Sequence, residues 1–221
     1  MAGALFEFSI GQERERDRKV YGIALGMVVE NVDSTGEARV KVALPWLPGV
    51  EPWARIAAPG AGTARGFFSI PQIGDEVLIA FNQGDPTEAF VLGALWSTIA
   101  RPPALLPTDS VTKRVLRTPA GHVIELDDAL QTVTVTTSTQ QTVTVGPDAI
   151  EMRSGLLPAG QVSTLRMDVA GNVTISAALT LTLDAKAITL KGETITVKGT
   201  GTASFLADGV CTVRGSQVFI N

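Results

Sequence analysis

The chain has 221 residues and a formal net charge of −4; 45% of its side chains are hydrophobic, 18% charged and 5% aromatic. This composition excludes a disordered chain, which would be polar and highly charged, and no apolar run approaches the roughly 20 residues of a membrane-spanning helix. One cysteine, Cys211, and one histidine, His122, exclude an intrachain disulfide and a multi-histidine metal cluster within one chain. We therefore expect no cofactor and no metal site.

Residues 1–19 form a separate N-terminal arm in this interpretation. An apolar alternation of Leu5, Phe6, Phe8 and Ile10 precedes a mixed-charge run over residues 13–19. Such a segment is typical either of a solvated arm or of a docking segment that orders on a partner, and both interpretations stay open on composition alone.

Short alternating apolar runs recur between residues 20 and 96, a block that holds all three tryptophans and the only tyrosine. Turn residues separate the runs, and no helical periodicity competes with the strand pattern. Residues 60–66 are expected to be a loop. Five or six strands in so short a block predict a small closed or partly open β-barrel. The clearest predicted strands cover residues 23–29, 38–44, 53–57, 76–81 and 89–96.

Residues 97–113 contain three prolines and predict a stiff linker. The segment that follows, residues 118–128, has the pattern of a turn and a short alternating strand.

From there to the C-terminus, pairs of apolar residues two positions apart recur between turn residues. A gap of two places both members on one face of a strand, whereas a coiled coil needs gaps of three and four. The pairs are Val133/Val135, Val143/Val145, Ile150/Met152, Leu165/Met167, Val173/Ile175, Leu181/Leu183, Ile188/Leu190, Ile195/Val197, Cys211/Val213 and Val218/Ile220.

Strands this short are not stable alone, and two architectures could bury them. One is a single-chain β-solenoid. The other is a β-prism in which three chains wind together and each chain supplies strands to every wall. The spacing of the pairs varies between about seven and ten residues, and no strict solenoid repeat is present, which favours the three-chain architecture.

The barrel block resembles the OB-fold of the baseplate assembly protein V family, the central spikes of contractile phage tails, which are related to type VI secretion spikes. The resemblance covers roughly residues 20–221, and residues 118–128 are similar to the start of the β-helix in that family. The segments that carry it in the barrel are residues 26–31, 38–46, 53–57, 65–71, 74–81, 84–86 and 91–96.

The resemblance implies an all-β homotrimer: an OB-fold barrel at residues 20–96, then an intertwined triple-stranded β-helix at residues 114–221. The implied function is structural and non-enzymatic, a spike that pierces the target envelope when the sheath contracts. It would belong to the tail baseplate of a virion or to a phage-tail-like particle assembled in the bacterial cytoplasm. The implied β-helix interior consists of Val173, Ile175, Leu181, Leu183, Ile188, Leu190, Ile195, Val197 and Val213.

The resemblance also implies partners at both ends. A separate baseplate hub protein is expected on the N-terminal side, with Leu5, Phe6, Phe8 and Ile10 as its docking residues. The His-x-His pattern with which some phage spikes bind iron is absent, so we expect a conical tip protein at the C-terminus instead. The target membrane is expected to be contacted only on piercing. The expected tip-binding residues are Val218, Phe219, Ile220 and Asn221.

Enzymatic interpretations are weaker. His122 could pair with Asp127 or Asp128 as an acid and base, but it lies in a structural turn motif. Cys211 is expected at an inward strand position, where a small thiol packs well rather than reacts. Glu125, Asp127 and Asp128 could bind calcium, although a solvated acidic turn is the simpler interpretation.

Two binding functions remain as rivals. An oligonucleotide-binding barrel could stack bases on Trp46, Trp53 and Trp96, but residues 20–96 contain eight acidic and four basic residues, which disfavours nucleic acid. These tryptophans are expected in the core or at a trimer interface. A carbohydrate-binding or depolymerising β-helical tail protein is the other rival, and Phe205 and Phe219 are the only aromatics after residue 113 to support it.

Overall fold

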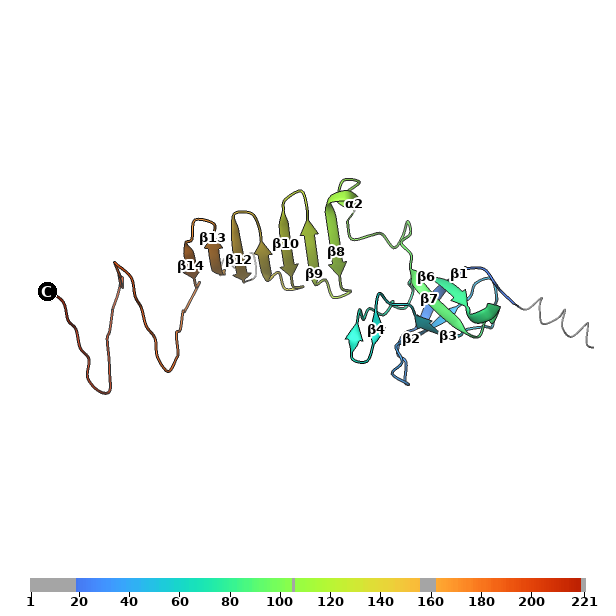
Figure 1. Ribbon diagram of the computed structural model, residues 1–221, viewed down its shortest axis with the longest axis horizontal. Helices are drawn as coiled ribbons and strands as arrows, with labels where there is room; N and C mark the ends of the chain where they lie inside the picture. The colour runs from blue at the N-terminus through green and yellow to red at the C-terminus, as the bar shows by residue number, and fades with distance from the viewer. Residues whose placement is uncertain (1–18, 105, 156–161, 220–221) are drawn as a thin grey trace, which may run out of the picture.

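The computed structural model describes residues 19–104, 106–155 and 162–219. In these ranges the chain is almost entirely β, with one 3-10 turn, η1 (Asn82–Gly84), and one short helix, α2 (Asp109–Thr112) (Figure 1). The strands are β1 (Ala24–Glu30), β2 (Arg39–Ala43), β3 (Trp53–Ile56), β4 (Ala61–Gly62), β5 (Arg65–Gly66), β6 (Glu76–Phe81), β7 (Ala89–Ala94), β8 (Lys113–Arg117), β9 (Val123–Asp127), β10 (Thr132–Thr136), β11 (Thr142–Val145), β12 (Ala149–Ser154), β13 (Ser163–Asp168) and β14 (Val173–Ser176).

The first strands close into a five-stranded barrel in the order β1-β2-β3-β7-β6. All neighbours pair antiparallel except β3 and β7, which run parallel through Arg55 and Ile56. The predicted small barrel is therefore confirmed, and each strand bound lies within two residues of its expected position. Closure leaves no free edge in the barrel, which removes the main route to unwanted strand pairing.

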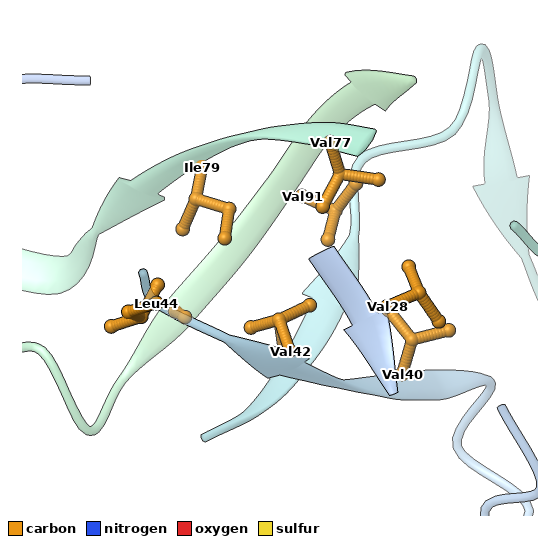
Figure 2. Close-up of a cluster of buried hydrophobic side chains, with 9 residues drawn as sticks. Val28, Val40, Val42, Leu44, Val77, Ile79 and Val91 are labelled. Carbon is orange, nitrogen blue, oxygen red and sulfur yellow. The ribbon is translucent and has the colours of Figure 1, made fainter. Parts of the chain in front are cut away.

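Side chains from all five barrel strands converge on one core (Figure 2). Inward positions alternate with outward ones along β2 and β6, which is why the predicted apolar alternation of these strands succeeded. The buried residues are Val28, Val40, Val42, Leu44, Ala54, Val77, Ile79, Ala89 and Val91. All are aliphatic, so the centre of the barrel is filled without a tryptophan.

The loop between β1 and β2 is held by a single carboxylate. Asp33 accepts hydrogen bonds from Arg39 Nε (3.0 Å), Thr35 Oγ1 (2.7 Å) and the backbone N–H of Thr35 (3.0 Å). The hydrogen bond from Arg39 is the largest cause that holds the pKa of Asp33 far below its usual range. The Arg39 guanidinium also lies over the ring of Trp53, 5.8 Å from its centroid, which ties the loop to β3.

Residues 60–66, expected to be a loop, instead contain the small hairpin of β4 and β5. Gly66 sits at a φ of +134°, where a Cβ would collide with the carbonyl oxygen of Gly60. Strand propensities do not predict this hairpin, because the segment is rich in glycine, which is normally depleted in strands.

No tryptophan belongs to the buried core: Trp46 and Trp96 are exposed and Trp53 is half-buried, and their expected place at a trimer interface stays a prediction. Trp46 is 43% exposed and donates a hydrogen bond from Nε1 to the carbonyl oxygen of Leu25 (3.1 Å). Its ring meets Phe81 edge-on, with 6.0 Å between centroids. Trp96 is exposed. The interior of this five-stranded barrel is filled by small and medium aliphatic side chains, which leaves no room for an indole.

The second body is a seven-stranded antiparallel sheet in which β8 to β14 follow one another in chain order (Figure 1). Strands are confirmed at the predicted apolar pairs from Val133/Val135 to Val173/Ile175. The expectation that each chain supplies strands to every wall is wrong for this segment. Short turns, such as the one between β9 and β10, let consecutive strands pair within one chain at a small loop-closure cost.

Beyond Ser176 the chain forms no strand or helix through residue 219, and runs as an extended zigzag (Figure 1). The predicted strands at Leu181/Leu183, Ile188/Leu190 and Ile195/Val197, and those at Cys211/Val213 and Val218, are thus not formed within a single chain. Among the described residues, no backbone–backbone hydrogen bond involves residues 177–219. Segments of about three residues between turns are too short to pair stably with their own neighbours.

The barrel core generates the first prediction. Ile79→Ala removes a fully buried side chain and should lower the free energy of unfolding of the barrel by about 2–5 kcal/mol, through lost burial and a residual cavity. Urea denaturation followed by tryptophan fluorescence measures it, because Trp46, Trp53 and Trp96 all report on the barrel. Leu92→Ala, at an exposed position of β7, is the control and should stay within about 0.5 kcal/mol of wild type. Equal losses of unfolding free energy in both variants would contradict the assignment of Ile79 to the core.

Candidate functional site

The seven-stranded sheet carries two continuous rows of apolar side chains on one of its faces. In each row, every residue lies directly opposite its neighbour on the next strand. The first row is Leu116, Ile124, Val135, Val143, Met152, Leu165 and Ile175. The second row begins with Arg114 and continues through Leu126, Val133, Val145, Ile150, Met167 and Val173. We call these thirteen apolar residues the apolar face.

The apolar face is uncovered in the described part of the chain. Leu126 is 44% exposed, Val145 45% and Ile175 56%, although each belongs to a paired strand. A soluble sheet normally packs such a face on a core, because apolar area left in water is unfavourable. Contiguous exposed apolar surface of this size marks an interaction site.

The opposite face is polar and rich in threonine and ion pairs. Its central row consists of Val115, Glu125, Thr134, Thr144, Glu151, Arg166 and Thr174. Glu151 lies across from Arg166, with 3.9 Å between carboxylate and guanidinium, and 3.4 Å from Arg153 on its own strand. The two faces therefore differ as sharply as the inner and outer faces of a closed sheet.

A buried carboxylate fixes the turn at the start of the sheet. Asp127 Oδ1 accepts hydrogen bonds from the backbone N–H groups of Ala129 (2.9 Å) and Leu130 (3.0 Å). Its Oδ2 lies 3.4 Å from Lys113 Nζ, which also meets Glu125 Oε1 at 3.1 Å. The backbone hydrogen bond from Leu130 is the largest cause that lowers the pKa of Asp127. The carboxylate thus joins β8, β9 and the turn into β10.

The residues considered for catalysis do not form a reactive constellation. His122 Nδ1 accepts a hydrogen bond from the backbone N–H of Ser138 (3.2 Å) and so links two turns at one end of the sheet. Asp127 is occupied by its turn and by Lys113. Cys211 is exposed and lies outside any strand, so its expected inward strand position is not found within one chain.

The remaining predicted site residues fall into two groups. Leu5, Phe6, Phe8, Ile10, Ile220 and Asn221 lie outside the described residues. Val218 and Phe219, together with the expected β-helix interior from Leu181 to Val213, are exposed on the extended segment. Only Val173 and Ile175 of that expected interior belong to a strand of the sheet. Their roles stay predictions.

The sequence reasoning overlooked the beginning of the apolar face. Leu116, Ile124 and Leu126 had not been grouped with the later pairs, although Ile124 and Leu126 show the same spacing of two. The gap of two between Ile124 and Leu126 is the signal in the sequence that predicts the start of the apolar face.

Metal and membrane features are not found in the described ranges. No three His, Cys, Asp or Glu side chains gather there as a potential metal site. No helix among residues 19–104, 106–155 and 162–219 is both long and apolar enough to cross a bilayer.

Comparison with known proteins concerns the barrel. Residues 24–96 match the family described as the type VI secretion system/phage-baseplate injector OB domain. The matched range contains all five strands of the closed barrel.

Spike proteins are among the chain's relatives. It is 34% identical over 108 residues to the actin cross-linking toxin VgrG1 of Vibrio cholerae. Over a stretch of the same length it is 32% identical to the type VI secretion system spike protein VgrG3 of the same species. Each match covers 46% of this chain and 10% of the relative. The type VI secretion system spike protein VgrG5 of Pseudomonas aeruginosa is 31% identical over 102 residues, 43% of this chain and 13% of the relative.

The turn at Asp127 generates the second prediction. Its pKa is lower in the folded chain, so folding favours the ionised form and this stabilisation is complete above the ordinary carboxyl pKa of about 3.9. It is lost as the pH falls below that value toward the folded pKa. Asp127→Asn should therefore reduce sheet stability at pH 7, and the difference from wild type should shrink near pH 3.

Urea unfolding followed by far-ultraviolet circular dichroism at fixed protein concentration measures this. Asp128→Asn, an exposed neighbour, is the matched control and should follow wild type at both pH values. If the stability difference between Asp127→Asn and wild type is the same at pH 7 and pH 3, the ionised carboxylate does not stabilise the sheet.

Proposed function

We propose that this chain is the structural, non-enzymatic central spike of a contractile injection particle, either a phage tail or a phage-tail-like device. The observation that carries the proposal is the match of the barrel at residues 24–96 to the injector OB domain family, and the identity of 31–32% to type VI secretion spike proteins supports it. In this role the spike pierces the target envelope when the sheath contracts. It is assembled in the bacterial cytoplasm as part of the baseplate.

The proposed working form is a homotrimer. A single copy leaves the apolar face uncovered and the segment 177–219 without backbone partners. Identical copies arranged about one axis would cover the face and supply partners to the segment. In this arrangement the apolar faces turn inward, the polar faces turn outward, and residues 177–219 wind together as a triple-stranded β-helix. Intertwined chains lose strands only by cooperative opening, which suits a piercing part.

The proposed organisation along the chain keeps four parts. An arm at residues 1–19 docks on a separate hub protein through Leu5, Phe6, Phe8 and Ile10. The barrel at 20–96 and the linker at 97–113 follow, and residues 114–221 make the spike. The linker ends in α2, directly before β8.

A mass measurement tests the trimer. Light scattering on the purified chain should give three times the 23.2 kDa of one copy, and the species should persist in unheated SDS, because intertwined strands separate slowly. A chain that is monomeric by light scattering and in unheated SDS would contradict the intertwined spike.

The role is tested in the bacterium that carries the gene. Deleting the gene should abolish killing or infection by its particles, and the wild-type gene should restore it. Particles that puncture their targets equally well without this chain would contradict the spike function.

The C-terminus is the proposed site for a conical tip protein. Val218 and Phe219 are exposed there, and Ile220 and Asn221 complete the proposed site. Deletion of residues 214–221 should abolish capture of the tip protein in a pull-down, because the blunt end of the helix then lacks its last apolar residues. Phe205→Ala, which removes another exposed aromatic of the same segment, is the control and should leave capture intact. Capture by the deleted chain would place the tip protein elsewhere.

A further inference from the structure

Two different surfaces could hold the copies of this chain together: the apolar face of the sheet, and the segment 177–219. The two are built differently in a single copy. We infer that the apolar face is the primary contact between copies, and that residues 177–219 close onto one another only after the sheets have joined. This inference rests on the proposed homotrimer and concerns how that trimer is held.

The apolar face is complete before any partner arrives. Every ladder from β8 to β14 closes within one chain, so the two apolar rows are already in register and the backbone of these strands is already paired. Association through this face therefore orders side chains but little backbone. Preorganised surfaces lose less conformational entropy on binding than surfaces that must fold.

The size of the apolar face is sufficient for a stable interface. Eleven of the thirteen residues are each at least 38% exposed, and they span all seven strands, an extent comparable with the roughly 800 Å² that each partner of a standard stable interface buries. The face has a charge only at Arg114, at its first edge, whereas the opposite face has charged residues on β8, β9, β12 and β13. The apolar face is thus the side of the sheet that loses least on leaving water.

The segment 177–219 has the opposite properties. Its described residues make no backbone–backbone hydrogen bond, and Leu179, Leu206 and Val210 are each at least 79% exposed. To form a helix of three chains it must order its whole backbone at the moment of association. Such coupled ordering lowers the affinity obtained from a given interface area.

The occupant of the apolar face follows from the same geometry. The segment continues directly from β14, so joining the sheets in register brings equivalent pairs of three copies to the same height, from Leu181/Leu183 to Ile188/Leu190 and Ile195/Val197. Tethering raises the effective concentration of the three segments into the millimolar range. Only further copies of this chain supply both a matching apolar face and a matching segment, so we assign the face to them.

Full-length variants with matched controls separate the two surfaces. Val143→Asp places a charge in the middle of the first row, and three such charges would meet inside a trimer. Thr142→Asp puts the same residue on the polar face of the same strand, opposite Arg153. Leu190→Asp and Thr189→Asp form the equivalent pair in the segment 177–219.

Two readouts are needed, the mass by light scattering and the protection of residues 177–219 from trypsin. Cleavage after Lys186, Lys191 and Lys198, identified by mass spectrometry, reports on the segment. We expect Val143→Asp to be monomeric and cleaved at these lysines. We expect Leu190→Asp to remain trimeric and be cleaved there. Thr142→Asp and Thr189→Asp should be trimeric and protected.

A milder variant guards against misfolding of Val143→Asp. Val143→Ala keeps an apolar residue in β11 and should raise the protein concentration at which the trimer forms by at least tenfold, with trypsin protection returning at that same concentration. Tryptophan fluorescence should match wild type in Thr142→Asp, Thr189→Asp and Leu190→Asp, which remain trimeric and leave the barrel untouched.

Two results would overturn the inference alone: a trimeric, protected Val143→Asp variant, or a monomeric Leu190→Asp variant. A monomeric wild type would instead overturn the proposed trimer together with it. The wild-type mass therefore distinguishes failure of the proposed function from failure of this hierarchy.

Discussion

An extended backbone needs hydrogen-bond partners, and this requirement separates the described chain into a paired part up to Ser176 and an unpaired part after it. Up to Ser176 each strand finds its partner in the same chain, first by closing a barrel and then by folding back and forth as a meander. After Ser176 the described chain finds none. Buried backbone groups without partners are strongly unfavourable, so the two parts must reach their final state by different routes. The change occurs at one residue and not gradually along the chain.

The barrel and the sheet solve the problem of apolar burial in different ways. The barrel encloses its aliphatic core and leaves tryptophans on the outside, whereas the sheet turns its valines, isoleucines and leucines to an open face. Closure makes the barrel self-sufficient. The backbone of the sheet is paired, but its apolar face is uncovered, which is why the proposed oligomer depends on the sheet more than on the barrel.

The sequence was a good guide to the strands and a poor guide to their partners. Alternation at Val133/Val135 or at residues 76–81 reports which side chains share a face, and those strands are present. It does not report whether the neighbour belongs to the same chain, because a ladder within a chain and a ladder between chains require the same side chains. The meander from β8 to β14 was therefore assigned to intertwined chains.

Other features escaped for local reasons. The hairpin at residues 60–66 is mostly glycine and alanine, whose strand propensity is low. A place in the core was one of the two predicted for the tryptophans, because aromatic residues usually dominate cores, but the inward positions of β2, β3 and β6 are filled by valine, alanine and isoleucine. The apolar face was recognised only in part, because its register across seven strands is a property of the folded sheet.

The polar face of the sheet has an electrostatic consequence. Lys113, Glu151 and Arg166 each lie within 4.0 Å of a side chain of opposite charge, and residues 97–221 contain ten basic and ten acidic residues. Paired charges produce fields that fade within a few ångströms, well inside the Debye length of about 8 Å at physiological ionic strength. A surface of this kind offers no long-range attraction to polyanions such as lipopolysaccharide or nucleic acid. In the proposed spike, such a surface would pass charged envelope layers without adhering to them.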